Sequence, residues 1–262
     1  MRLLRFKPDG QLTITEFFGD DIPPYIILSH TWGPPDEEVT FKDIVEGKGN
    51  LKPGYRKINF CGTWVNENAR VGLEYFWIDS CCIDQSSSAE LSEAINSMFR
   101  WYRNAEVCYV YLADVQYYSN KWKYPGDGGW LSEFRASRWF TRGWTLQELL
   151  APTNLFFYSA DCVFLGNEIS LIEQVHKATG IPVQAILGNT PLSQYDAEEI
   201  ISWGKNRQTT REEDAAYSLL GLLDISMPVI YGEGRDKAFR RLRKEIWESS
   251  GDKPWMRPKN GD

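Results

Sequence analysis

Short apolar runs alternate with helically spaced apolar positions along the first 165 residues. Each run is closed by polar, glycine or proline residues, as is typical of buried strands; the runs cover residues 25–29, 75–78, 107–112 and 155–158. Between them, apolar positions recur every three or four residues, which predicts helices over residues 57–73, 91–102 and 145–150. This alternation predicts an α/β fold with a mostly parallel sheet flanked by helices.

After about residue 165 the pattern changes to helices alone, expected at residues 169–179, 197–203, 212–223 and 235–247. The stretch after residue 249 is rich in Gly, Pro and Lys and has no periodicity. We therefore divide the chain into an N-terminal lead-in (1–24), an α/β core (25–165), a helical extension of the same domain (166–249) and a flexible tail or linker (250–262).

Composition narrows the class of protein. Hydrophobic residues make up 42% of the 262 residues, enough for a substantial core, and the net charge of −7 argues against a nucleic-acid-coating surface. No apolar run approaches the roughly 20 residues that span a bilayer. The five cysteines are an odd number and lack the spacing of a disulfide framework, and there is no signal peptide. These features indicate reduced thiols in a cytoplasmic protein. Two histidines and no C-x-x-C motif leave too few ligands for a metal site.

Polar side chains gather where the predicted strands end. His30, Thr31, Trp32 and Gly33 follow the first strand, and Asp79 and Ser80 follow the second. Ligands of parallel α/β sheets bind outside the carboxyl ends of the strands, so this edge is the predicted site. Asp79 suits a ligand or metal contact there, or a cap on the following turn.

Residues 137–150 (SRWFTRGWTLQELL) place one carboxylate, Glu148, among tryptophans and arginines. Thr145 and Glu148 fit the S/T-x-x-E capping box, in which the glutamate only closes a helix start. The other interpretation is a ligand site, since aromatic faces and guanidinium groups hold planar, phosphate-bearing molecules. A helix start would then keep the carboxylate ionised.

Several segments in one order resemble the signature blocks of the fungal heterokaryon-incompatibility (HET) domain family. They are residues 25–33 (YIILSHTWG), 76–85 (FWIDSCCIDQ), 137–150, 214–221 (DAAYSLLG) and 227–233 (MPVIYGE). The resemblance covers roughly residues 24–248 and implies a cell-death-inducing effector domain of fungal non-self recognition. It also implies C-terminal nucleotide-binding oligomerisation and repeat domains in the full-length protein.

A second, more distant resemblance is to Toll/interleukin-1 receptor (TIR) domains, and it implies a TIR-like (flavodoxin-like) sheet. In many TIR enzymes the glutamate of a W-C-x-x-E-L motif is required for cleaving NAD+. Residues 144–149 (WTLQEL) are similar, with Thr145 where Cys is common and Arg142 where Ser is usual two places before the Trp. The resemblance implies that Glu148 is catalytic, that NAD+ is a substrate rather than a cofactor, and that the protein forms a homo-oligomer on activation.

In this interpretation the other residues of the edge bind NAD+. Trp32, Trp139 or Trp144 stacks on a ring, Arg138 or Arg142 meets the pyrophosphate, and His30, Thr31, Gly33, Asp79 and Ser80 line the opposite side. One alternative is a non-enzymatic death-effector module that acts by homotypic assembly or partner recruitment, with Glu148 as a cap. Another is a hydrolase with Cys81 as nucleophile and His30 or His176 as base.

Overall fold

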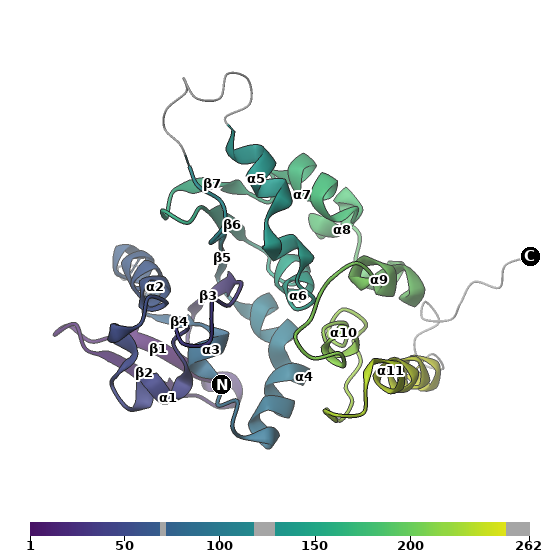
Figure 1. The fold of residues 1–262 in the computed structure, drawn as a ribbon, viewed down its shortest axis with the longest axis horizontal. Helices are drawn as coiled ribbons and strands as arrows, with labels where there is room; N and C mark the ends of the chain where they lie inside the picture. The colour runs from purple at the N-terminus through teal and green to yellow at the C-terminus, as the bar shows by residue number, and fades with distance from the viewer. Residues whose placement is uncertain (69–71, 118–128, 250–262) are drawn as a thin grey trace, which may run out of the picture.

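The computed structural model describes residues 1–68, 72–117 and 129–249, so the predicted tail at 250–262 lies outside the described residues. Within these ranges the strands form a seven-stranded sheet of order β2-β1-β4-β3-β5-β6-β7 (Figure 1). The strands are β1 (Arg2–Phe6), β2 (Leu12–Glu16), β3 (Tyr25–His30), β4 (Tyr75–Trp77), β5 (Val107–Tyr111), β6 (Leu155–Tyr158) and β7 (Phe164–Asn167).

The four central strands are parallel and confirm the predicted α/β sheet. β3 pairs in parallel with both β4 and β5, and β5 pairs in parallel with β6. Their spatial order (second, first, third, fourth) is that of flavodoxin-like sheets, in which the chain reverses direction between the first and third strands. Here that switch point lies between the carboxyl ends of β3 and β5. All six residues of β3 are buried, as expected for a strand covered on both faces.

The antiparallel edges of the sheet were not predicted. Residues 1–24, expected as a lead-in, contain the hairpin of β1 and β2, whose register runs from Arg2↔Glu16 to Phe6↔Leu12. β1 continues the sheet by pairing with β4 through Leu4 and Phe76. Gly10, at φ 82°, supplies the left-handed turn conformation between the two strands. At the other edge, β7 pairs antiparallel with β6.

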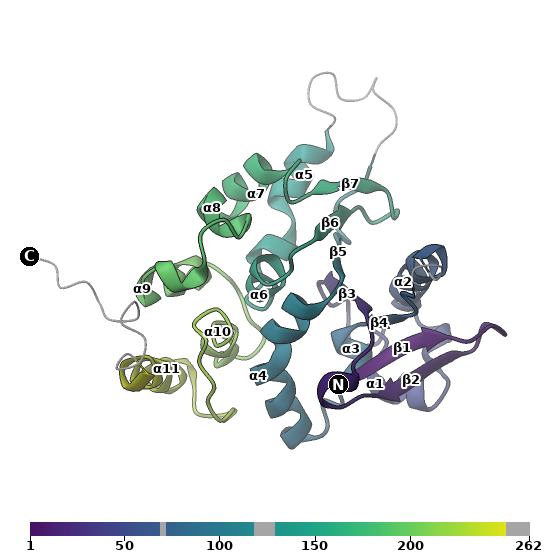
Figure 2. The same ribbon diagram turned by 180° about the vertical axis from the view of Figure 1, so that it is seen from behind.

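Helices cover both faces of the sheet, and strand alternation decides which residues meet which helix. α2 (Tyr55–Asn68) packs its Phe60 ring against Tyr109 and Tyr158, whereas α4 (Ser88–Asn104) packs Trp101 and Tyr102 against Trp77. In both views α2 lies on one side of the sheet, with α4 and α6 (Thr145–Leu150) on the other (Figures 1 and 2).

The same alternation separates the last residues of β3. Ile27 is in register with Trp77, so Ile27 and Ser29 face α4 and α6. His30 is in register with Tyr111, whose ring contacts Phe60, so His30 faces α2. Shorter helices connect these elements: α1 (Phe41–Val45), α3 (Asp79–Cys82), α5 (Trp130–Ala136) and the 3-10 turn η4 (Arg138–Thr141).

The helical extension contains α7 (Ile172–Thr179), α8 (Val183–Ile186), α9 (Ala197–Gly204), α10 (Asp214–Tyr217) and α11 (Arg235–Ser249). The helix predicted at 212–223 is only the short α10. Its continuation is a series of tight turns whose leucines, Leu219, Leu220, Leu222 and Leu223, are all buried. Gly221 lets this segment dock on α4, because a Cβ there would lie 2.0 Å from the Cβ of Phe99. Across the described ranges, no helix is long and apolar enough to cross a membrane.

Candidate functional site

Glu148 points into the protein and not at its own helix start. Glu148 is 4% exposed, and its Oε2 accepts a hydrogen bond from Ser29 Oγ. The N-cap of α6 is Trp144, which makes no side-chain cap hydrogen bond. Thr145 Oγ1 instead donates to the carbonyl oxygens of Trp139, at 2.5 Å, and Arg142, at 2.9 Å. The capping-box interpretation is therefore wrong.

A short hydrogen-bond chain fixes the carboxyl group at the carboxyl end of β3. Trp139 Nε1 donates a hydrogen bond to Ser29 Oγ at 2.7 Å, and Ser29 Oγ in turn donates one to Glu148 Oε2. Ser29 and Trp139 are both buried. Glu148, on the helix that precedes β6, thereby contacts the end of β3 next to the topological switch point.

Burial controls the charge of Glu148. Desolvation, followed by the negative charge of Asp79, raises the pKa of Glu148 to about 8, while Ser29, Tyr102 and Arg207 act in the opposite direction. The expectation that the helix start keeps Glu148 ionised is thus not met. α6 is only six residues long, and the loss of hydration outweighs the field of so short a helix. At neutral pH this arrangement holds a neutral carboxyl group.

On the opposite face of the sheet, His30 lies between two carboxylates. Its Nε2 is 3.5 Å from Glu38 Oε1 and its Nδ1 is 3.8 Å from Asp79 Oδ1, and neither nitrogen has a hydrogen-bond partner. Lys57 Nζ, from α2, lies 2.7 Å from Glu38 Oε2. Burial alone would raise the pKa of Glu38, but the His30 ring and the Lys57 ammonium outweigh it and hold that pKa well below its usual range.

Asp79 and Trp32 form the exposed rim between the two faces. Trp32 Nε1 donates to Asp79 Oδ2 at 2.7 Å, and Trp32 is 43% exposed, so its ring is accessible for stacking. Asp79 Oδ1 accepts from the amide of the next residue, Ser80, at 2.7 Å, but the N-cap of α3 is Ile78, which makes no side-chain cap hydrogen bond. The cap interpretation of Asp79 is therefore not supported, and its role in a ligand contact stays a prediction.

The remaining predicted residues of the first two blocks surround Glu38. The Gly33 amide donates to Glu38 Oε2 at 2.9 Å, and Ser80 Oγ lies 3.5 Å from Glu38 Oε1. Lys57 Nζ donates to the Thr31 carbonyl at 3.4 Å. Sequence reasoning did not find Glu38, the last of three consecutive acidic residues, or Lys57, which follows Arg56, because such short charged runs usually lie on solvated surfaces.

Three predicted residues of the third block have their contacts elsewhere. Arg138 is exposed, and its backbone amide and guanidinium both meet Asp114. Arg142 Nη2 donates to Thr210 Oγ1 at 3.0 Å, and Trp144 lies against Asp214. In the described part of the chain, these three side chains make no hydrogen bond or ion pair with Glu148 or His30.

A buried arginine of the helical extension joins the site instead. Arg207 is 8% exposed, and its Nη1 donates to the Arg142 carbonyl at 2.9 Å and to Thr145 Oγ1 at 3.0 Å. Arg207 and Glu148 each shift the other's pKa toward the charged form. No local pattern distinguishes Arg207 in the sequence, because it stands in a polar loop more than 50 residues after Glu148.

The thiols offer no nucleophile at this edge. Cys81 is buried, its Sγ lies 3.4 Å from the Val39 carbonyl, and burial raises the pKa of the thiol well above its usual value. Among the described residues, no group of three or more His, Cys, Asp or Glu side chains could hold a metal ion.

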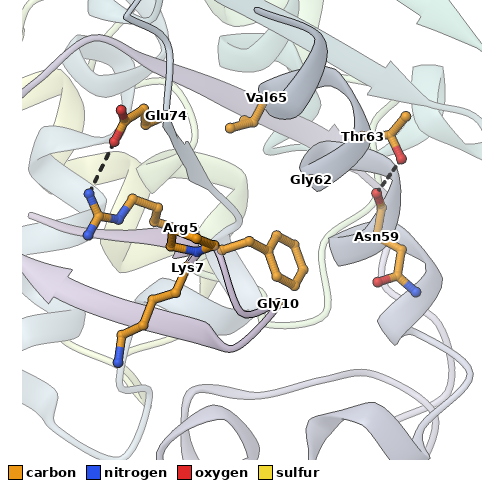
Figure 3. Close-up of a pocket in the computed structure, with 10 residues that line it drawn as sticks. Arg5, Lys7, Gly10, Asn59, Gly62, Thr63, Val65 and Glu74 are labelled. Atoms are coloured by element: carbon orange, nitrogen blue, oxygen red, sulfur yellow. Dashed lines mark hydrogen bonds and ion pairs between the residues drawn. The ribbon is translucent and has the colours of Figure 1, made fainter. Parts of the chain in front are cut away.

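A surface cavity of about 810 Å³ lies away from Glu148, between the β1–β2 hairpin and α2 (Figure 3). Arg5 pairs with Glu74 at its wall, at 3.1 Å, and Phe6 fills the space beside Gly62. Glu74 directly precedes β4, so this cavity lies at the amino edge of the parallel strands. It is not the predicted site.

Comparison with known proteins places these features in a family. Residues 25–125 match the family described as "Heterokaryon incompatibility protein (HET)". The "Vegetative incompatibility protein HET-E-1" of Podospora anserina is 50% identical over 252 residues, which are 96% of this chain and 18% of that protein. The chain thus spans less than a fifth of this relative's length. No solved structure matches the chain. The chain belongs to the heterokaryon-incompatibility family and forms a HET domain.

Proposed function

We propose that this HET domain is an effector of fungal heterokaryon incompatibility that causes cell death by hydrolysing the N-glycosidic bond of NAD+, with Glu148 as the catalytic carboxylate. The observation that carries the proposal is the bond from Ser29 to Glu148. The Glu148 carboxyl group neither caps its own helix nor forms a salt bridge. It lies at the strand ends, where α/β sheets bind ligands.

The role in incompatibility rests on the relative. HET-E-1 is named as a vegetative incompatibility protein, and half of its aligned residues are identical to those of this chain. Because the chain spans 18% of that protein, the domain is proposed as an effector part that other domains control.

The chemistry needs only one well-placed carboxylate. When the bond between ribose C1′ and the pyridinium nitrogen breaks, its electron pair stays on that nitrogen. Nicotinamide then leaves as a neutral molecule without protonation. The ribose passes through an oxocarbenium-like state, and a water molecule bonds to C1′ and releases one proton to the solvent. An ionised Glu148 beside the ribose stabilises the positive charge that develops there. Trp32, exposed at the rim, supplies a face for stacking.

In this structure Glu148 has the environment of an inactive, resting enzyme. A carboxyl group that is buried and neutral at pH 7 stabilises a cation poorly, so catalysis requires the carboxylate to be exposed and ionised. Movement of α6, or of the turn η4 that carries Trp139, away from Ser29 would expose and ionise the Glu148 carboxyl group. We propose that homo-oligomer assembly drives it and that the isolated monomer has low activity.

The test is nicotinamide release by purified, concentrated protein. Wild type is compared with Glu148→Gln and with the matched control Glu173→Gln, which removes an exposed carboxylate on α7. We expect release by wild type and Glu173→Gln, and at least a hundredfold loss in Glu148→Gln. Inert wild type under assembling conditions would refute NAD+ cleavage, and a fully active, folded Glu148→Gln would refute the role of Glu148.

The competing function is a non-enzymatic module that acts by assembly alone. It predicts that Glu148→Gln still kills cells when expressed in a fungal host, although it releases no nicotinamide. Killing by Glu148→Gln equal to wild type would favour the module, whereas loss of killing together with catalysis supports the enzyme.

A further inference from the structure

A segment of the helical extension runs beside the loop that leads into α6. Gln208 forms a parallel bridge with Arg142: the Gly143 amide donates to the Gln208 carbonyl at 2.9 Å, and the Gln208 amide to the Thr141 carbonyl at 2.6 Å. Gly143 permits this approach, because a Cβ there would lie 2.5 Å from Thr209 Cγ2. The extension is therefore fixed to the start of the helix that carries Glu148.

This ladder inserts Arg207 into the protein interior. Arg207 Nη1 holds two oxygens of the α6 approach, the Arg142 carbonyl and the Thr145 hydroxyl, while Arg207 Nη2 is buried with no hydrogen-bond partner. A buried guanidinium group that has only neutral partners is costly, so the fold alone does not account for a charge at this position. Burial lowers the pKa of Arg207 to about 10, and the Glu148 carboxylate, when ionised, acts against that shift.

We propose that Arg207 is a positioning residue that anchors the first turn of α6 and provides the positive charge that favours ionisation of Glu148. The catalytic part of this inference rests on the proposed NAD+ cleavage, but the electrostatic part does not. It makes the helical extension a component of the site, since Arg207 reaches α6 from beyond α9.

The charges around Glu148 leave this role to Arg207. Asp79 of α3 contributes a negative charge, Ser29 of β3 and Tyr102 of α4 contribute hydroxyl groups, and β5 contributes the buried thiol of Cys108. Among these groups, Arg207 contributes the positive charge that lowers the pKa of Glu148.

The first experiment titrates Glu148 directly. The side-chain carboxyl ¹³C resonance of Glu148, assigned by its absence in Glu148→Gln, is followed against pH in wild type, Arg207→Met, Arg207→Lys and the control Lys205→Met. Lys205 is an exposed cation on the same segment. We expect Arg207→Met to raise the pKa of Glu148 by less than about one pH unit, because Arg207 acts on it less strongly than the Ser29 and Tyr102 hydroxyl groups do, and Arg207→Lys to keep it close to wild type. Lys205→Met should leave it unchanged.

An unchanged pKa of Glu148 in folded Arg207→Met overturns the inference. A purely structural role predicts that Arg207→Lys, which loses the paired bonds, behaves like Arg207→Met. If Arg207→Met does not fold, the reciprocal measurement needs no Arg207 variant. The Arg207 Nε–H resonance of wild type should shift with the titration of Glu148, and the shift should vanish in Glu148→Gln. Its persistence in Glu148→Gln would contradict the coupling.

Activity separates this inference from the proposed function. If wild type releases nicotinamide, the acid limb of its pH profile should move to higher pH in Arg207→Met and stay in place in Arg207→Lys. If wild type releases none, the proposed function fails, and the titration still decides the role of Arg207.

Discussion

Two buried glutamates lie at the same edge of the sheet, on opposite faces, and have opposite electrostatic characters. Glu148, on the face of α4 and α6, contacts a hydroxyl group, and burial raises its pKa to about 8. Glu38, on the face of α2, contacts the Lys57 ammonium at 2.7 Å, and its pKa is held well below the usual range. Burial is common to both, so the contacting partner determines the charge.

The difference assigns different tasks to the two faces. An ion pair with its charge satisfied, such as Glu38 with Lys57, fixes the loop after β3 but has little capacity left for a ligand. A carboxyl group kept neutral by desolvation can change its charge when its surroundings open. We therefore propose that the face with Glu148 is the reactive one and that the face with His30 supports it.

Removing the cation from the supporting face has the largest expected effect. Lys57→Met leaves Glu38 buried without its ammonium partner, which should cost about 4 kcal/mol of unfolding free energy at pH 7. Chemical denaturation measures it. The double variant Lys57→Met/Glu38→Gln is the control and should recover most of the loss. Equal stability of Lys57→Met and wild type would contradict the buried ion pair.

The two glutamates should also give stability opposite pH dependences. Glu148 binds its proton more tightly in the folded chain, so its contribution is full below the ordinary pKa of about 4.5 and is lost as pH rises through about 8. Relative to Glu148→Gln, wild type should lose about 3 kcal/mol between pH 5 and pH 7.5. Glu38 acts in the reverse sense, with stability lost as pH falls below about 4.5. A pH-independent difference between wild type and Glu148→Gln would mean that Glu148 is ionised throughout.

Removing the hydroxyl partner of Glu148 should cost less unfolding free energy than removing the charge of Lys57. Ser29→Ala removes the donor to Glu148 and leaves Trp139 Nε1 without its acceptor, which should cost about 2 kcal/mol. It should also raise the pKa of Glu148 above that of wild type. Ser86→Ala, in an exposed turn, is the control, and denaturation of the three proteins at pH 6 makes the comparison.

The rim should contribute to binding with little effect on stability. Trp32→Ala removes an exposed ring and should change the unfolding free energy by less than about 1 kcal/mol. It should raise the KM for NAD+ severalfold through lost stacking, whereas Trp32→Phe should keep most of the affinity. Unchanged KM in Trp32→Ala would remove this ring from the binding site.

Local pattern predicted the central sheet but not its edges. Each parallel strand is an uninterrupted apolar run, and β3 to β6 were found within a residue or two of their ends. β1 and β2 were missed because their mixed polar and apolar residues, RLLRF and LTITE, depend on pairing for their structure. α10 was predicted too long, because apolar residues on every side of residues 216–223 suit buried turns as well as a helix.

The candidate site divides in a similar way. Side chains next to strand ends, such as His30 and Asp79, were found because strand order alone brings them to one edge. The alternation that sends Ser29 and His30 to opposite faces requires the register of β3 with both neighbours. Arg207 and Glu38 reach the site through loop paths that no periodicity encodes. The long-range contacts of loops thus set the charges of the site.

The most direct test of the account is the pH dependence of nicotinamide release by assembled protein. Wild type should lose activity as pH falls, with a midpoint at or below about 8, because exposure of Glu148 on assembly lowers its pKa from the resting value, and Glu148→Gln should be inactive throughout. Release that is independent of pH, or that persists in folded Glu148→Gln, would contradict the assignment of Glu148 as the catalytic carboxylate.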